Sequence, residues 1–311
     1  MAKRKSKADP EEVPDAVSRR NQQDDDESGS DEDMDMVNVD FEWFDPQPAV
    51  DFHGLKTLLR QLLDVDAQLF DLSELTDVIL SQPMLGSTVK VDGNETDPYA
   101  FLTVLNLQTH KVPQPVPANF RPRVRTDRHA QDKKVIRDLT AYLSKKSSSL
   151  PALAPLLDPS SSAAQVGLIL TERFINMPHE VVPPMYTMLL EEIQWALQES
   201  EPYAFTHYLV LSKCYSQIQS ALTTDDAPRG KKAKKSDADE TFYFHPEDEL
   251  LQRFALGSTD FEYDTPVDEG ASDAKRAFQE LGVKPKGHMV LIEASKFEAA
   301  VEGLKTFLNG Q

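Results

Sequence analysis

Charged side chains directly follow a short apolar run in the middle of the chain. Residues 166–170 (VGLIL) are typical of a buried strand, and the turn over residues 171–182 holds Glu172, Arg173 and His179. The ends of central strands are where α/β proteins often place working residues, so Glu172 and Arg173 are candidates for catalysis or partner binding. We favour an ion pair between the two that fixes the loop, because structural networks also gather charges. Both are kept as candidate partner-binding residues.

The same turn argues against a phosphate-bearing cofactor. Residues 171–182 contain no glycine. A phosphate cradle uses glycines so that the backbone can approach the ligand and several N–H groups can converge on it. We therefore expect no cofactor site here.

The rest of the chain offers no recognisable catalytic or metal motif. Its seven histidines are scattered, and no two stand four residues apart on one helix beside a glutamate, as in zinc proteases. Neither the G-x-S-x-G elbow nor the G-x-x-x-x-G-K loop occurs. The single cysteine, Cys214, lies in an apolar run and is expected to be inert packing. The sequence thus predicts no catalytic residue, no cofactor and no metal ligand.

One carboxylate is out of place on the helix that follows the turn. Pro183 and Pro184 are tolerated in a first helical turn, and the apolar residues after them form a broad helical face that includes Glu192. A buried carboxylate needs a partner, and Arg173 is a candidate. The alternative is that Glu192 faces a binding groove.

Strands and helices alternate around this central segment. Before it we expect a strand over 37–44, helices over 50–63 and 71–80, a hairpin of strands over 86–91 and 99–107, and a helix over 131–143. After it we expect strands over 206–215, 241–245, 259–264 and 288–293, a helix over 246–254, and a last helix capped by Ser295. The strand over 99–107 is almost entirely apolar and is expected to be covered on both faces. The fold class is α/β, a mixed sheet flanked by helices.

Composition divides the 311 residues into an acidic tail and one domain. Residues 1–36 are strongly charged and poor in apolar side chains, so this tail is predicted to be disordered, as is an insertion over about 221–240. Residues 37–311 are predicted to form a single domain. The formal net charge of −19 disfavours direct nucleic acid binding and favours basic protein partners. No run approaches the length of a membrane span.

Short charged clusters in the tail and the insertion are candidate localisation signals and candidate partner contacts. The basic ones are candidate nuclear signals or merely solvated runs: Lys3, Arg4, Lys5, Lys7, Lys231, Lys232, Lys234 and Lys235. The acidic ones are candidate contacts for a basic partner: Asp24, Asp25, Asp26, Glu27, Asp31, Glu32 and Asp33. Ser28 and Ser30 each have an aspartate three residues on and are candidate phosphorylation sites.

Several segments, taken in order, resemble the BCCIP family. They are VNVDFEWFDP at 37–46, SELTDVILSQPMLGSTVK at 73–90, FLTVLNL at 101–107, VGLILTERFINMPHEVVPPMY at 166–186 and YLVLSKCY at 208–215. A lysine-rich insertion and the segment FYFHPEDE follow, so the resemblance covers nearly all of residues 37–308.

The resemblance implies a fold similar to the GCN5-related acetyltransferases, but catalytically inactive. In true acetyltransferases of that group a glycine-containing pyrophosphate loop follows the fourth strand, where this chain has the glycine-free turn 171–182. The resemblance further implies a nuclear protein that shuttles to the cytoplasm and escorts a newly made basic protein of the large ribosomal subunit. It also implies a part in nuclear export of a phosphoinositide kinase, with effects on actin organisation and vesicle transport, and contacts with nuclear transport receptors. The alternative is an acyl-CoA-dependent acetyltransferase with a divergent cofactor loop.

Overall fold

A mixed β-sheet is the centre of the fold. The structure, a computed structural model, describes residues 40–82, 85–108, 128–158, 164–217, 241–266 and 283–309, with side chains in the third range from residue 134 on. Eight strands form one sheet in the order β1-β2-β3-β4-β5-β8-β7, and β6 also pairs with β5. The strands are β1 (Glu42–Phe44), β2 (Ser87–Lys90), β3 (Ala100–Asn106), β4 (Val166–Arg173), β5 (His207–Gln217), β6 (Thr241–Tyr243), β7 (Gly257–Phe261) and β8 (Val283–Glu293).

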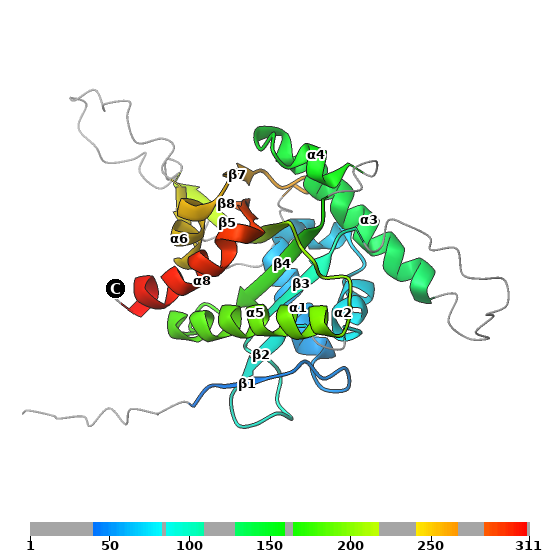
Figure 1. Cartoon of the computed structure of the whole chain (residues 1–311), viewed down its shortest axis with the longest axis vertical. Helices are drawn as coiled ribbons and strands as arrows, with labels where there is room; N and C mark the ends of the chain where they lie inside the picture. The colour runs from blue at the N-terminus through cyan, green and yellow to red at the C-terminus, as the bar shows by residue number, and fades with distance from the viewer. Residues whose placement is uncertain are drawn as a thin grey trace, which may run out of the picture. The chain divides into compact units, whose positions relative to one another are not determined.

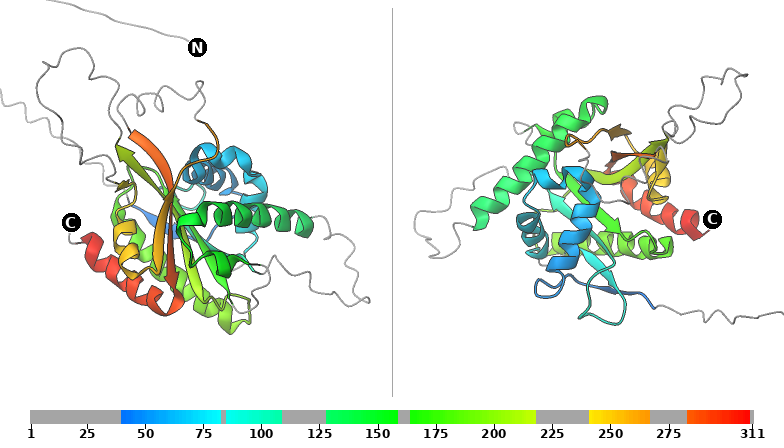
Figure 2. Two further views of the ribbon diagram at one scale, coloured as in Figure 1. Left: turned by 90° about the horizontal axis from the view of Figure 1, so that it is seen from above. Right: turned by 180° about the vertical axis from the view of Figure 1, so that it is seen from behind.

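Helices cover both faces of this sheet (Figures 1 and 2). One face packs against α1 (Phe52–Leu63), α2 (Leu72–Leu80) and α3 (Arg128–Lys146), and the other against α5 (Val182–Gln198), α6 (Glu247–Phe254) and α8 (Ala294–Asn309). Shorter elements are α4 (Ala154–Leu157) and the 3₁₀ helices η1 (Asp64–Leu69), η2 (Ser147–Ser149) and η3 (His179–Val181).

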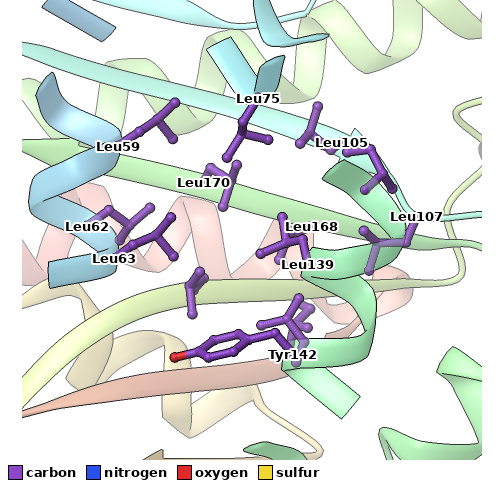
Figure 3. Packing of buried hydrophobic residues seen from close by; sticks show 14 of the residues in the cluster. Leu59, Leu62, Leu63, Leu75, Leu105, Leu107, Leu139, Tyr142, Leu168 and Leu170 are labelled. Atoms are coloured by element: carbon purple, nitrogen blue, oxygen red, sulfur yellow. The ribbon is translucent and has the colours of Figure 1, made fainter. Parts of the chain in front are cut away.

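The alternation of side chains along the central strands builds two cores. In β4, Leu168 and Leu170 point into the α1–α3 core, whereas Ile169 points into the α5–α8 core. All seven residues of β3 are buried, which confirms the prediction of a strand covered on both faces. Figure 3 shows the first core, where Leu59 and Leu139 meet the strand leucines. Each such buried leucine stabilises the fold by about 1.5–3 kcal/mol.

The two central strands run parallel and then part. β4 and β5 pair in parallel from Val166↔His207 to Leu170↔Leu211, and α5 lies in the crossover between them. Beyond that point β4 pairs only with β3, while β5 continues and pairs β6 from Cys214 to Ser216. A gap in the sheet is therefore left alongside Ser212 and Lys213 of β5.

Several predicted boundaries are wrong. The strand at residue 166 does not end at 170 but continues to Arg173, because Glu172 and Arg173 pair with β3 and their charges find buried partners. β1 begins only at Glu42, and residues 37–39 lie outside the described part. β7 begins earlier than predicted and ends at Phe261, and β8 begins five residues before the predicted start. The last helix already includes Ala294, so Ser295 is not its cap.

The predicted tail, 1–36, and the predicted insertion, 221–240, both lie outside the described residues. No helix in the described ranges is long and apolar enough to cross a membrane.

Candidate functional site

A cleft opens where β4 and β5 part, and we take it as the candidate site. Its volume is about 870 Å³. Charged and imidazole groups form part of its wall, and the exposed apolar side chains of Tyr99, Ile175 and Phe244 lie around it. The carboxyl ends of parallel strands are the usual place for a ligand in α/β proteins, so the position agrees with the sequence-based hypothesis.

Glu172 is held in this wall by a lysine and a histidine. Its carboxylate lies 2.6 Å from Nζ of Lys213 and 3.2 Å from Nε2 of His245, and the residue is 2% exposed. Burial alone raises the pKa of a carboxyl, but His245 and Lys213 outweigh it and lower the pKa of Glu172 to about 2. Glu172 is therefore ionised and already paired at neutral pH.

Arg173 leaves the same strand on the opposite face and pairs with Glu247. Both terminal nitrogens of the guanidinium donate to the carboxylate, a bidentate arrangement, and Glu247 lies at the start of α6. Despite burial, this pairing raises the pKa of Arg173 and lowers that of Glu247. Nδ1 of His245 lies 3.8 Å from Glu247, so the imidazole stands between the two pairs.

The predicted ion pair between Glu172 and Arg173 is therefore wrong. Successive side chains of a strand point to opposite faces, which separates the two groups and gives each a different partner. Their direct link is a hydrogen bond from the backbone N–H of Arg173 to the carboxylate of Glu172, at 3.0 Å.

Arg173 is also not the partner of Glu192. The Glu192 carboxylate accepts the backbone N–H of Gly86 at 2.8 Å and the hydroxyl of Ser87 at 3.1 Å, both from the start of the β2 segment. Burial raises the pKa of Glu192, and the nearby carboxylates of Asp45 and Glu191 raise it further against these two hydrogen bonds. Glu192 also lines a surface groove, and the alternative interpretation that this groove binds a partner stays a prediction.

Cys214, Asp260 and His288 bring potential metal-ligating atoms within 4.8 Å of one another. Nδ1 of His288 and the Asp260 carboxylate are 2.6 Å apart, which is a hydrogen-bond distance. Two ligands of one tetrahedral zinc ion would lie about 3.3 Å apart, so the group as it stands fits hydrogen bonding and not metal ligation. Burial raises the pKa of the Cys214 thiol, in keeping with an inert packing role.

Sequence reasoning missed Lys213, His245 and Glu247, the partners of Glu172 and Arg173. Lys213 interrupts the apolar strand LVLSKCY, and a charge in a buried strand signals a partner elsewhere. His245 and Glu247 flank Pro246, the residue before the first residue of α6, which is a weaker signal. The proposed nuclear signals, the acidic contact residues 24–33, Ser28 and Ser30 all lie outside the described residues.

The fold and the cleft together define a class. This is a three-layer α/β protein in which the cleft at the end of the central parallel strands is walled by charges that pair with one another. The chain belongs to the BCCIP family, whose family model matches residues 36–120 and 124–251, and this confirms the resemblance seen in the sequence.

Relatives and a solved structure agree with that membership. Protein bcp1 of Aspergillus fumigatus is 58% identical over 282 residues, covering 90% of each chain. Protein bcp1 of Schizosaccharomyces pombe is 48% identical over 279 residues, covering 88% of this chain and 90% of that one. The crystal structure of BCP1 from Saccharomyces cerevisiae matches with a TM-score of 0.58 at 24% identity, over 92% of this chain and 96% of that one, a likeness that concerns the fold.

Proposed function

We propose that this protein is a non-enzymatic nuclear escort for a basic protein of the large ribosomal subunit, supporting ribosome biogenesis. The observation that carries the proposal is the net charge of −19 on a chain of the BCCIP family. A ribosomal protein outside the ribosome has a large positive surface that binds RNA indiscriminately. An acidic partner neutralises that surface and steers the encounter.

The cleft supports a binding role over a catalytic one. Lys213, Arg173, Glu172 and Glu247 satisfy one another as ion pairs, so their charges are already committed. The scaffold is proposed to be of the GCN5-related acetyltransferase type with its activity lost, because the turn after β4 has side chains where a pyrophosphate needs bare backbone.

The second candidate function is an acyl-CoA-dependent acetyltransferase, favoured by the size of the cleft at the carboxyl ends of β4 and β5. Titration calorimetry with acetyl-CoA separates the two functions. Tight, stoichiometric binding overturns the non-enzymatic proposal, whereas no heat of binding supports it.

A transport role extends the proposal. The protein is proposed to be nuclear, to shuttle to the cytoplasm, and to assist export of a phosphoinositide kinase, with effects on actin organisation and vesicle transport. Nuclear transport receptors would read the basic clusters 3–7 and 231–235. Neutralising both clusters should abolish nuclear enrichment of a fluorescent fusion; unchanged enrichment contradicts the signals.

The escort role is tested by a pull-down from cell extract in low and high salt, with partners identified by mass spectrometry. We expect basic large-subunit ribosomal proteins at low salt and fewer at high salt. A second pull-down after nuclease treatment removes partners bridged by RNA. Loss of every ribosomal protein from the nuclease-treated sample contradicts direct escort.

A further inference from the structure

A groove runs along the outer side of α5, away from the cleft between β4 and β5. It consists of two adjoining hollows of about 410 and 440 Å³. Met188 and Glu191 line both, so the hollows form one continuous feature, which we call the α5 groove. The first hollow reaches Trp195 and Asp45, and the second reaches Glu180 and Lys305.

The first hollow is acidic, and none of the described residues that line it is basic. Asp45, Glu191 and Glu192 line it. Across the described ranges, none of these three carboxylates has a basic nitrogen within 4.0 Å. Lys305 in the second hollow is paired with Glu302 at 2.9 Å. An added positive charge in the first hollow would therefore meet several carboxylates, and no described basic side chain already pairs with them.

Glu192 is a second observation, independent of the surface carboxylates. It is 6% exposed, yet its two hydrogen bonds come from the neutral groups of Gly86 and Ser87. A carboxylate has about four lone-pair sites, so each oxygen retains room for a further donor. Keeping such a group buried without a cation is costly, and a cation in the hollow would remove that cost.

Trp195 supplies an apolar face to the same hollow. It is 53% exposed, the most exposed aromatic side chain among the described residues. It lies four positions after Glu191 and three after Glu192 on α5, the spacing that places side chains on neighbouring turns of one helix face. An indole face within about 6 Å of a guanidinium attracts it. Met188 lines the same hollow, so the methylene stem of an arginine would have an apolar surface to lie on.

We propose that the α5 groove binds an arginine-bearing segment of a basic protein, with a guanidinium seated between Trp195 and the carboxylates of Asp45 and Glu191. This inference rests on the proposed escort function and places the binding site of the escorted ribosomal protein on the α5 groove. The planar guanidinium fits because it both stacks on an aromatic ring and donates to carboxylates in a fixed fork. A lysine at the same position would supply the positive charge but neither the planar stacking surface nor the forked donors.

Binding of an oligo-arginine peptide to the full chain tests the groove, with fluorescence anisotropy as the readout. The acidic residues at 24–33 also attract arginine, so the measurements are made in a full chain with Asp24, Asp25, Asp26, Glu27, Asp31, Glu32 and Asp33 neutralised. In that background Trp195→Ala and Glu191→Gln should each weaken binding about three- to tenfold, and Trp195→Phe should weaken it less. Oligo-lysine should bind more weakly than oligo-arginine.

Matched controls lie on the opposite face of the sheet. Leu69→Ala removes another exposed apolar side chain, 50% exposed, and Asp77→Asn removes an exposed charge on α2. Both should bind as the parent does. Equal peptide affinity of Trp195→Ala, Glu191→Gln and the controls overturns the groove assignment.

A parallel measurement uses basic proteins extracted from purified large ribosomal subunits. If the parent chain binds them and the groove variants bind equally well, the assignment of the binding site to the α5 groove is wrong, whereas the proposed escort function is supported. If the groove variants no longer bind the peptide but the wild-type chain binds no ribosomal protein, arginine binding in the α5 groove is supported and the proposed escort function is wrong.

Discussion

Lys90 and Asp51 show how this protein keeps charges in its interior. Both side chains are fully buried with Nζ 2.6 Å from the carboxylate, and the backbone carbonyl and side chain of Asn94 accept the remaining hydrogen bonds of the lysine. Arg173 and Glu247 follow the same logic beside the cleft. A buried pair adds little net stability compared with apolar residues, but removal of one partner leaves the other charge unpaired.

Breaking the Arg173–Glu247 pair should therefore be severe. We expect Arg173→Met to lower the free energy of unfolding by about 3–5 kcal/mol, because Glu247 would stay buried without its cation. Urea denaturation measures the loss. Lys296→Met, which breaks an exposed 3.3 Å pair with Glu293, is the matched control and should cost less than about 1 kcal/mol. Equal losses for the two variants would show that Arg173 is not held by a buried pair.

Asp248 should make the stability depend on pH. Burial and the neighbouring Glu247 raise its pKa from 3.8 to about 6, against His245, His288 and a hydrogen bond from Ser212. A raised folded-state pKa contributes stability that is present below about pH 4 and is lost as the pH rises through about 6. Asp248→Asn stays neutral, so we expect it to be more stable than wild type by about 1–3 kcal/mol at high pH.

Urea denaturation across the acidic and neutral range tests this. The difference between Asp248→Asn and wild type should vanish below about pH 4, where the wild-type carboxyl is protonated in both states. Asp77→Asn, at an exposed position of α2, is the control and should show no such pH-dependent gain. A constant difference at every pH would mean that Asp248 is not protonated in the folded protein near pH 6.

Helix α2 illustrates how a single element is placed by its own sequence. The carboxylate of Asp71 accepts the backbone N–H groups of Ser73 and Glu74 at 3.0 and 3.1 Å, which confirms the predicted N-cap. The following residues bury Leu75 and Ile79 against the sheet. A local cap and a local apolar stripe were enough to predict this helix.

Removal of that cap should destabilise the protein by a modest amount. Asp71→Ala leaves two helix N–H groups without their acceptor, so we expect a loss of about 1 kcal/mol in the free energy of unfolding. Asp77→Ala, an exposed aspartate within the same helix, controls for loss of charge and should change stability by less than about 0.5 kcal/mol. The prediction is contradicted if the two variants are equally stable in thermal and urea denaturation.

The whole chain has a net charge of −19, and this field acts beyond any single contact. A field of this sign favours the approach of basic proteins and disfavours nucleic acid, as the proposed escort role requires. The α5 groove would then provide the short-range contacts. Charge sets mainly the rate of encounter, whereas a few buried or stacked side chains set how long the complex lasts.

Association with a basic protein should therefore slow in salt. Raising the ionic strength from about 0.02 M to about 0.5 M shortens the Debye length severalfold, so we expect the association rate to fall by about tenfold or more. Stopped-flow fluorescence with basic proteins from large ribosomal subunits measures it. The dissociation rate should change less, and Trp195→Ala should raise that rate while leaving the salt dependence of association intact. A salt-independent association rate would contradict electrostatic steering.

The sequence by itself determined the α/β class, most of the strands and helices, the N-cap of α2 and the family. These follow from apolar periodicity, local capping and contiguous sequence motifs, all of which involve residues close together in the chain. The net charge and the glycine-free turn were also readable directly.

Only the tertiary structure decided which charges pair. Arg173 meets Glu247 across 74 positions, and Glu192 meets Gly86 across 106. Such partners depend on strand order and on which face each side chain leaves, and neither is encoded in local spacing. For the same reason the sequence placed Glu172 and Arg173 together in a loop, whereas the fold extends β4 through both and directs them to opposite faces of the sheet.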